Sequence, residues 1–243
     1  KAVDCALGNS VDAVISALLN GQIRTESIPF SITDPNEARP YYLMSRSDME
    51  ADLDVETRFY QPLYDTVAKA IEDAGLSAAD LKEMGVFIGS TSMDIPIYEA
   101  RYNRSEPKDY FTQSASGFGT IADNVARHFN IDGPCHTFTT ACTSSANGLL
   151  YAASLIRLGE MERALVIGYD RFNKLGFYGF ESLKLLSATT YRPFDKNRDG
   201  IIMGEACGVV VLDSRCPGHD AFRILGGANA CDTHNVALHN TDG

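Results

Sequence analysis

Cys142 is the residue whose type and surroundings are best suited to covalent chemistry. Before it, residues 136–140 are β-branched and aromatic, which predicts a short strand; after it, residues 143–158 predict a helix that ends at Gly159. At the start of a helix, unpaired backbone N–H groups and the helix dipole favour negative charge. A thiolate is the nucleophilic form of cysteine, so the position predicts a nucleophile, although a free cysteine taken alone is more often a small buried apolar residue.

The helix predicted after Cys142 has no polar face, because no charged side chain occurs from Thr137 to Ile156. Such a helix must be covered on all sides. Its first turns contain small residues, including Ser144, Ser145 and Gly148, which allow other backbone to approach closely. The strand, turn and helix therefore predict a central element of an α/β protein, around which other elements pack.

Two long segments resemble the β-ketoacyl synthases, the condensing enzymes of the thiolase fold. Residues 133–145, GPCHTFTTACTSS, match the family's T-x-x-C-[ST]-[ST] nucleophile elbow after a G-P strand. Residues 191–208 match its R-P-F-D-x-x-R-D-G-x-x-x-G-E-x-x-G segment, and residues 7–21 resemble its opening helix. The order and spacing of these segments extend the resemblance over nearly the whole chain.

The resemblance implies an α/β protein with a five-layered αβαβα sandwich built from two similar halves. The chain resembles the first half only: a single ketosynthase N-terminal-type domain over residues 1–243, with a central mixed sheet and one buried elbow helix. The family's two catalytic histidines, its lysine and its G-F-G turn lie in the second half, which we expect to be absent here. None of the five histidines of this chain fits those positions: His128, His136, His219, His234 and His239.

Two functions follow from the resemblance. The first is a chain-length-factor-like subunit of a heterodimeric β-ketoacyl-ACP synthase in fatty-acid or polyketide-type biosynthesis, aryl polyenes being one candidate product. It would shape the acyl tunnel beside a catalytic ketosynthase, with Cys142 vestigial. The alternative is an active ketosynthase or acyltransferase, or a fragment of one, in which Cys142 accepts the acyl group. Known chain-length factors are full length and usually lack the cysteine, so this chain departs from them on both counts.

A partner and a tunnel are implied in the same way. In the family, the strand before the nucleophile pairs across a dimer axis, so we expect Gly133–Thr139 at the interface with a full-length ketosynthase subunit, and residues 118–129 nearby. In chain-length factors, the region matching residues 110–121 limits the growing chain. Phe111 and Phe118 are its bulky residues and are the predicted acyl-tunnel residues.

The composition excludes several classes of partner. The formal net charge of −11 argues against nucleic acid and against an acidic membrane. It also disfavours docking of an acidic acyl carrier protein, so we expect the carrier to bind mainly through the partner subunit. No apolar run reaches the roughly 18 residues of a membrane span. The six cysteines lack disulfide-framework spacing, which favours reduced thiols and a cytoplasmic location.

Three motifs suggest cofactors or metals but are incomplete, so we expect none of either. Residues 195–200 begin like a calcium loop, but Ala206 stands where the bidentate glutamate is required, and a charged turn is the better reading. Residues 117–122 fit G-x-G-x-x-A without a preceding strand. The set of Cys231, His234 and His239 is too loosely spaced to indicate zinc.

The remaining elements follow from hydrophobic periodicity and turn residues. Residues 89–94, GSTSMD, place small polar groups at the end of a buried strand, where sites form in open α/β sheets. Residues 22–54 contain three prolines and no clear period, which predicts an exposed connection. Helices are predicted at 7–21, 55–74, 77–82, 94–104, 118–129 and 174–186, and strands at 85–89, 163–169, 208–213 and 221–230, the last two as antiparallel neighbours.

Overall fold

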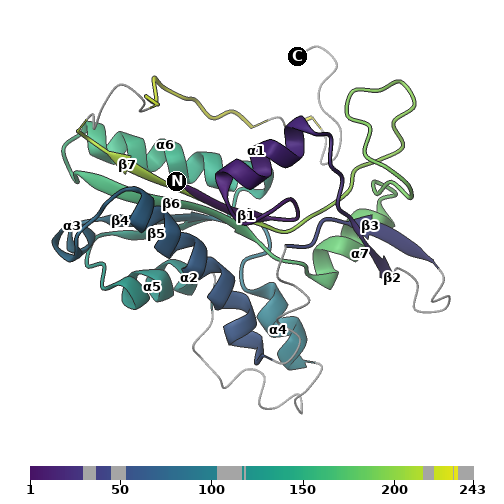
Figure 1. Cartoon of the computed structure of the whole chain (residues 1–243), viewed down its shortest axis with the longest axis horizontal. Coiled ribbons are helices and arrows are strands. Elements are labelled where there is room, and N and C mark those ends of the chain that lie inside the picture. Colours follow the sequence, from purple (N-terminus) through teal and green to yellow (C-terminus); the bar gives the residue numbers. More distant parts are fainter. Residues whose placement is uncertain are drawn as a thin grey trace.

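A five-stranded mixed sheet forms the centre of the computed structural model (Figure 1). The structure describes residues 1–29, 37–44, 53–102, 117, 119–215, 222–231 and 233–234. The middle strand β4 is parallel to β5 and β6, whereas β7 is antiparallel to β6 and to β1. Across the sheet the strands are β1 (Ala2–Cys5), β7 (Ala206–Asp213), β6 (Arg163–Asp170), β4 (Gly85–Gly89) and β5 (Cys135–Phe138). The mixed sheet predicted at the centre of the chain is confirmed.

Helices cover the two faces of the sheet in separate layers. Helix α6 (Ser144–Arg157) lies on one face, and α2 (Val55–Asp73) and α5 (Thr120–Phe129) lie on the other (Figure 1). Side chains alternate between these layers along each strand, as the period of a strand requires. Val86 and Ile88 enter the core under α2 and α5, while Phe87 enters the core under α6.

The helices predicted at 7–21, 55–74 and 77–82 are present, the first beginning four residues later than predicted, and each begins after a capping side chain. The Ser10 hydroxyl accepts a hydrogen bond from Ala13 N–H at the start of α1 (Val11–Leu19), and Asp54 accepts two at the start of α2. Ser77 and Asp80 form a reciprocal capping box at α3 (Ala78–Lys82). These side chains satisfy N–H groups that have no partner within their own helix.

The apolar spacing of α2 explains its burial. Phe59, Leu63, Val67 and Ala70 recur at helical spacing, and each is at most 4% exposed. They form one stripe that packs against β1 and β7. Helix α2 therefore covers the face of the sheet opposite the elbow helix, α6.

Two shorter helices meet beside the ends of β4 and β6. Helix α4 (Ile95–Tyr102) carries Glu99, whose two carboxylate oxygens accept hydrogen bonds from Lys174 and Leu175 N–H, each at 2.8 Å. Those two donors open α7 (Lys174–Ser182), so a carboxylate from one helix stabilises the N-terminus of the other. The helices predicted at residues 94–104 and 174–186 are therefore present. Helix α7 ends at Ser182, four residues earlier than predicted.

The prediction of an exposed connection over residues 22–54 is correct in exposure for most of residues 22–29, but it is wrong about regular structure and about burial at Tyr41 and Met44. Strands β2 (Glu26–Pro29) and β3 (Ala38–Tyr41) pair antiparallel. Tyr41 is 2% exposed and packs edge-on against Phe172, and Arg39 forms an ion pair with Glu181 at 2.8 Å. These contacts join residues more than 100 positions apart, so the local pattern of prolines did not reveal them.

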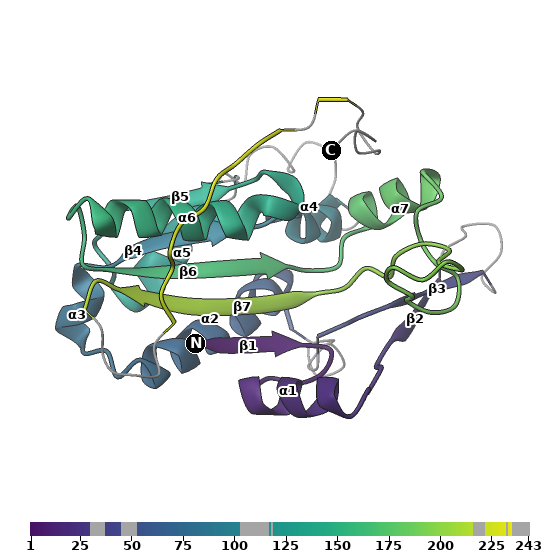
Figure 2. The same ribbon diagram turned by 90° about the horizontal axis from the view of Figure 1, so that it is seen from above.

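The strand predicted over residues 221–230 is also wrong. The described residues 222–230 form no strand, because β7 already has β6 on one side and β1 on the other. The segment instead crosses over α6, where Arg157 donates a hydrogen bond to the Ile224 carbonyl at 2.6 Å (Figure 2).

Helix α6 is not covered on all sides by the described chain. Ala152 is fully buried against the sheet, but Tyr151 is 44% exposed and Leu158, just past the helix, is 73% exposed. In the part of the chain that the structure describes, no helix is both long and apolar enough to cross a membrane.

Candidate active site

The chain turns sharply between β5 and α6, and this turn carries Cys142. Ala141 has φ +53°, in the left-handed region that non-glycine residues rarely adopt, and residues Ala141–Thr143 form a single 3-10 turn that runs into α6. The predicted order of strand, sharp turn, cysteine and helix is therefore present. An uncommon backbone conformation held by its surroundings is typical of functional sites.

Polar side chains brace this turn. Ser144, which is 3% exposed, accepts a hydrogen bond from Thr140 N–H at 2.9 Å and donates one to the Ala141 carbonyl at 2.6 Å. Thr143 donates its hydroxyl to the Thr140 carbonyl at 2.8 Å, and the Asn147 amide donates to the Thr140 hydroxyl at 2.7 Å. The uncharged polar residues after Cys142 thus hold the backbone that positions the thiol.

Cys142 is exposed and lies in the 3-10 turn directly before α6. The first hydrogen bond of the 3-10 turn is donated by Thr143 N–H to the Thr140 carbonyl, at 3.3 Å. The N–H groups of Ala141 and Cys142 precede it, as the first donors of a helix do. Cys142 therefore lies at the N-terminal end of α6, where the backbone N–H groups precede the hydrogen bonds of the helix.

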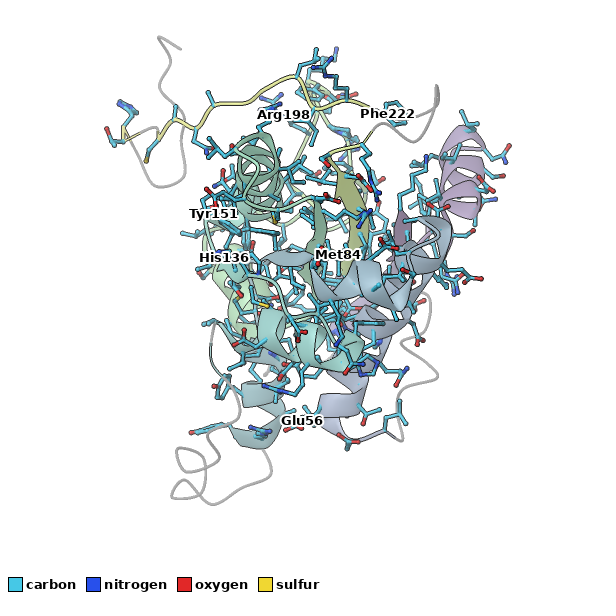
Figure 3. The ribbon with its side chains drawn as sticks, turned by 90° about the vertical axis from the view of Figure 1, so that its left-hand side faces the viewer. Glu56, Met84, His136, Tyr151, Arg198 and Phe222 are labelled. Atoms are coloured by element: carbon cyan, nitrogen blue, oxygen red, sulfur yellow. The ribbon has the colours of Figure 1, made fainter. Side chains whose placement is uncertain are left out.

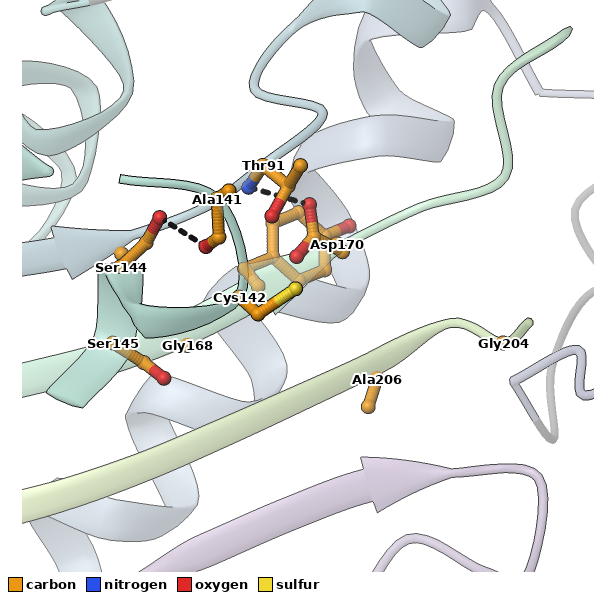
Figure 4. Close-up of a pocket in the computed structure, with 11 residues that line it drawn as sticks. Thr91, Ala141, Cys142, Ser144, Ser145, Gly168, Asp170, Gly204 and Ala206 are labelled. Atoms are coloured by element: carbon orange, nitrogen blue, oxygen red, sulfur yellow. Dashed lines mark hydrogen bonds between the residues drawn. The ribbon is translucent and has the colours of Figure 1, made fainter. Parts of the chain in front are cut away.

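A cavity of about 240 Å³ opens beside the thiol (Figure 4). Three segments meet around it: the elbow, the carboxyl ends of β4 and β6, and the entry to β7. The carboxyl ends of neighbouring parallel strands lie at the same edge of a sheet, where sites form in α/β folds. The cavity is lined by Gly89, Thr91, Ala141, Cys142, Ser144, Ser145, Gly168, Tyr169, Asp170, Gly204 and Ala206.

Glycines allow this close approach. A Cβ atom on Gly89, the last residue of β4, would lie 2.2 Å from the Ser145 nitrogen, and one on Gly168 would lie 3.1 Å from the Ser145 Cβ. The sequence predicted that small residues in the first turns of the helix would let other backbone approach. That prediction is confirmed, with the approaching strands identified as β4 and β6.

Asp170, at the end of β6, holds the segment that follows β4. Its Oδ1 atom accepts hydrogen bonds from Thr91 N–H at 2.9 Å and Ser92 N–H at 2.7 Å. The Ser90 and Ser92 hydroxyls donate to the same oxygen at 3.1 and 2.7 Å. One oxygen at the end of β6 thus accepts hydrogen bonds from three consecutive residues that follow β4, which fixes this wall of the cavity.

A buried ion pair fixes the wall next to β7. Arg171 Nε lies 3.3 Å from Glu205 Oε1, and both side chains are less than 10% exposed. Glu205 also accepts hydrogen bonds from Met44 N–H at 3.0 Å and Phe172 N–H at 2.8 Å. A buried pair with additional hydrogen bonds has the partners that a desolvated charge needs. Glu205 lies between Gly204 and Ala206, so it positions two residues of the cavity.

Sequence reasoning identified Cys142 and the polar segment 89–94 but missed Asp170. The signal that could have found it is an acidic residue directly after the apolar run ALVIGY, at the end of a strand expected to neighbour 85–89. The predicted tunnel residues Phe111 and Phe118 lie outside the described residues. His128 stacks on Tyr64 and His136 stacks on Phe87, and neither lines the cavity.

No group of three or more potential metal ligands occurs within the described ranges of the chain. The residues of the calcium-like motif form a charged turn: Asp195 accepts a hydrogen bond from Asn197 N–H at 2.7 Å, and Asp199 pairs with Arg192 at 3.3 Å.

Comparisons with known proteins agree with the strand-turn-helix and its flanking motifs. Residues 20–216 match the family model described as the beta-ketoacyl synthase N-terminal domain. The chain is 27% identical over 232 residues to 3-oxoacyl-[acyl-carrier-protein] synthase 2 of Vibrio harveyi, an overlap of 85% of this chain and 54% of that protein. It is 26% identical over 273 residues to the chloroplastic 3-oxoacyl-[acyl-carrier-protein] synthase I of Arabidopsis thaliana, covering 97% and 56%. The chain thus spans about half the length of these relatives.

The fold is similar to that of a ketosynthase, ApeO, in complex with its chain length factor, ApeC, from Xenorhabdus doucetiae. The TM-score is 0.69 with 24% identity, over 88% of this chain and 57% of the other. This likeness shows the thiolase-type ketosynthase fold.

Proposed function

Because the chain belongs to the β-ketoacyl synthase family, we propose that it takes part in acyl transfer, with Cys142 as the residue that accepts the acyl group. The observation that carries this proposal is the exposed Cys142 at the N-terminus of α6, which lines a cavity. A thiolate so placed has the access and the electrostatic support of a nucleophile.

The reaction is a thioester exchange. The Cys142 sulfur attacks the carbonyl carbon of an acyl thioester and forms a new C–S bond. The C–S bond to the carrier's thiol breaks, and the released thiolate takes a proton from water. In this proposal the Cys142 N–H donates a hydrogen bond to the carbonyl oxygen as negative charge develops on it. The relatives are named for acyl-carrier-protein substrates, so the donor is an acyl carrier protein. With a net charge of −11 on this chain, an acidic carrier would dock mainly on a partner subunit.

The test uses the full chain and an acyl N-acetylcysteamine thioester, with intact-mass and peptide analysis. We expect one acyl group per chain, on the peptide that contains Cys142, and none in Cys142→Ala. Cys231→Ala is the matched control, because Cys231 is also exposed but lies outside the cavity, and it should be acylated like the wild type. Equal labelling of both cysteines, or no labelling of either, would remove the proposed role of Cys142.

A second function is favoured by a separate observation: the chain leaves apolar surface uncovered beside an edge strand. β5 pairs only with β4 in the described sheet, so its outer N–H and C=O groups can pair with another strand. His136, Phe138 and Tyr151 form an aromatic group at this edge, with the His136 and Tyr151 rings 5.3 Å apart (Figure 3). This supports a chain-length-factor-like subunit whose partner is a full-length ketosynthase, paired through Gly133–Thr139.

The two functions separate when the partner ketosynthase is present. If this chain mainly shapes the acyl tunnel, Cys142→Ala retains product formation, and Phe111→Ala or Phe118→Ala lengthens the products. If this chain supplies the condensing nucleophile, Cys142→Ala abolishes condensation while the complex still assembles. Product length is read by mass spectrometry and assembly by size-exclusion chromatography.

A further inference from the structure

The cavity beside Cys142 has a single charged lining residue in the described chain, and that residue is Asp170. The other lining residues are small, or they are neutral hydroxyl-bearing and thiol-bearing side chains. Asp170 and Thr91 face the Cys142 thiol across the opening (Figure 4). The nearest buried acidic residue along the chain, Glu205, is paired with Arg171, so it adds no comparable unpaired negative charge.

Asp170 is held in a fixed direction beside the cavity by four hydrogen bonds to one oxygen. Its Oδ1 accepts hydrogen bonds from Thr91 and Ser92 N–H and from the Ser90 and Ser92 hydroxyls. Because all four donors converge on one oxygen, they fix the direction of the Asp170 side chain. The donors also determine the position of the charge, since they come from backbone and side chains of one short segment between β4 and α4.

The cavity is small enough for the charge on Asp170 to interact electrostatically with a group attached to Cys142. A sphere of the cavity's volume, 240 Å³, is about 8 Å across, no more than the distance over which physiological salt screens a charge, about 8 Å. A second negative charge inside the cavity would therefore be repelled, and in a partly desolvated site this repulsion exceeds its value in bulk water.

The geometry points to Asp170 as a specificity-determining residue that makes the Cys142 site select uncharged acyl groups over acyl groups that carry a carboxylate. The proposal rests on the proposed acyl transfer at Cys142 and adds its substrate class. Selectivity of this kind comes from electrostatic repulsion of the carboxylate-bearing acyl group. It does not require an additional contact with the uncharged acyl group. Asp170 acts without touching the reacting carbonyl.

The first test uses iodoacetamide and iodoacetate, which differ mainly in charge. Each alkylates a thiolate by forming a C–S bond and releasing iodide, so neither needs a carrier. The rate ratio of iodoacetamide to iodoacetate at Cys142, measured by mass spectrometry on the full chain, should fall about tenfold in Asp170→Asn. The ratio at Cys231 in the same samples should stay constant. An unchanged ratio at Cys142 would overturn the proposal.

Two control variants separate charge from shape. Ser92→Ala removes one donor to Asp170 but leaves the carboxylate, so the ratio at Cys142 should stay high. Glu83→Gln removes one negative charge at the opposite end of β4, before Gly85, and should also leave the ratio unchanged. If Ser92→Ala lowers the ratio as far as Asp170→Asn does, order in the segment rather than charge is responsible, and the proposal fails.

A second test uses pentanoyl and glutaryl N-acetylcysteamine thioesters, which match in length. The wild type should transfer pentanoyl about tenfold faster than glutaryl, and Asp170→Asn should reduce this preference to within about threefold. Equal rates in the wild type would refute the selectivity alone. Alkylation of Cys142 without transfer from either thioester would instead refute the proposed acyl transfer.

Discussion

At the scale of single residues, most polar groups around the elbow have hydrogen-bond partners, whereas a few buried polar atoms among the described residues have none. Ser144, Thr143 and Asn147 form hydrogen bonds to Thr140 at the elbow, and one oxygen of Asp170 accepts four donors. Asp94, directly before α4, is fully buried, and neither of its oxygens accepts a hydrogen bond from the described residues. A buried carboxylate without partners destabilises a fold.

Asp94 therefore predicts a pH-dependent stability. Burial raises the pKa of Asp94, and the nearby N–H groups of Asp94 and Gly117 counter this only in part. The folded pKa lies above the unfolded one, so the contribution of this group to stability is full below the unfolded pKa of about 3.9 and is lost as pH rises through the folded pKa. Asp94→Asn should raise the free energy of unfolding by about 1 kcal/mol at pH 8. The gain should disappear near pH 4.

Urea unfolding at several pH values measures this difference. Asp132→Asn is the control, because Asp132 is exposed and its replacement should leave the curve near that of the wild type. A constant offset between Asp94→Asn and wild type from pH 4 to 8 would show that Asp94 is not the titrating group.

At the scale of elements, the site depends on how closely β4 approaches the start of α6. Gly89 lies against the backbone of Ser144 and Ser145, and a Cβ there would meet three backbone atoms within 2.4 Å. Backbone atoms, unlike the end of a flexible side chain, cannot move without shifting the helix. The contact thus links the position of a strand directly to the position of Cys142.

Gly89→Ala should therefore lower both stability and reactivity. Forcing a methyl group into this contact should cost about 1–3 kcal/mol or more of unfolding free energy and slow alkylation of Cys142. Gly208→Ala on β7 is the matched strand control, since a Cβ there meets nothing within 4 Å. It should be neutral or stabilise by up to about 1 kcal/mol, because alanine loses less conformational freedom than glycine. Equal effects of the two variants would contradict the predicted strand-to-helix contact.

At the scale of the whole molecule, apolar side chains remain exposed along α6 and the segment that crosses it. Leu158 is 73% exposed, Phe222 is 93% exposed and Leu225 is 86% exposed. Such an exposed apolar surface is typical of an interaction site. Its apolar character predicts an obligate interface rather than a transient one.

Expressed without a partner, the chain should self-associate. Sedimentation velocity should show a mean mass that rises with concentration, and Leu158→Lys combined with Leu225→Lys should lower that mass. Leu183→Lys, which changes an exposed leucine beside α7, should have little effect. A monomer with a cooperative melt at all concentrations would count strongly against an obligate interface.

The sequence by itself determined the elements whose signals are local. The helix that begins at Val55, its apolar stripe and the elbow around Cys142 each depend on residues a few positions apart, so the local sequence was enough to predict them. The same local motifs indicated the family, because each long motif is a continuous segment.

Only the tertiary structure decided which segments meet. Asp170 and Thr91 are 79 positions apart and were joined by the pairing of β4 with β6, and Tyr41 became a core residue through contacts with Phe172 and Phe177. The fate of residues 222–230 depended on whether β7 had an open side, which no pattern within that segment encodes. Long-range pairing is determined by the packing of the whole sheet. The position of Asp170 in the wall of the Cys142 cavity could therefore be known only from the tertiary structure.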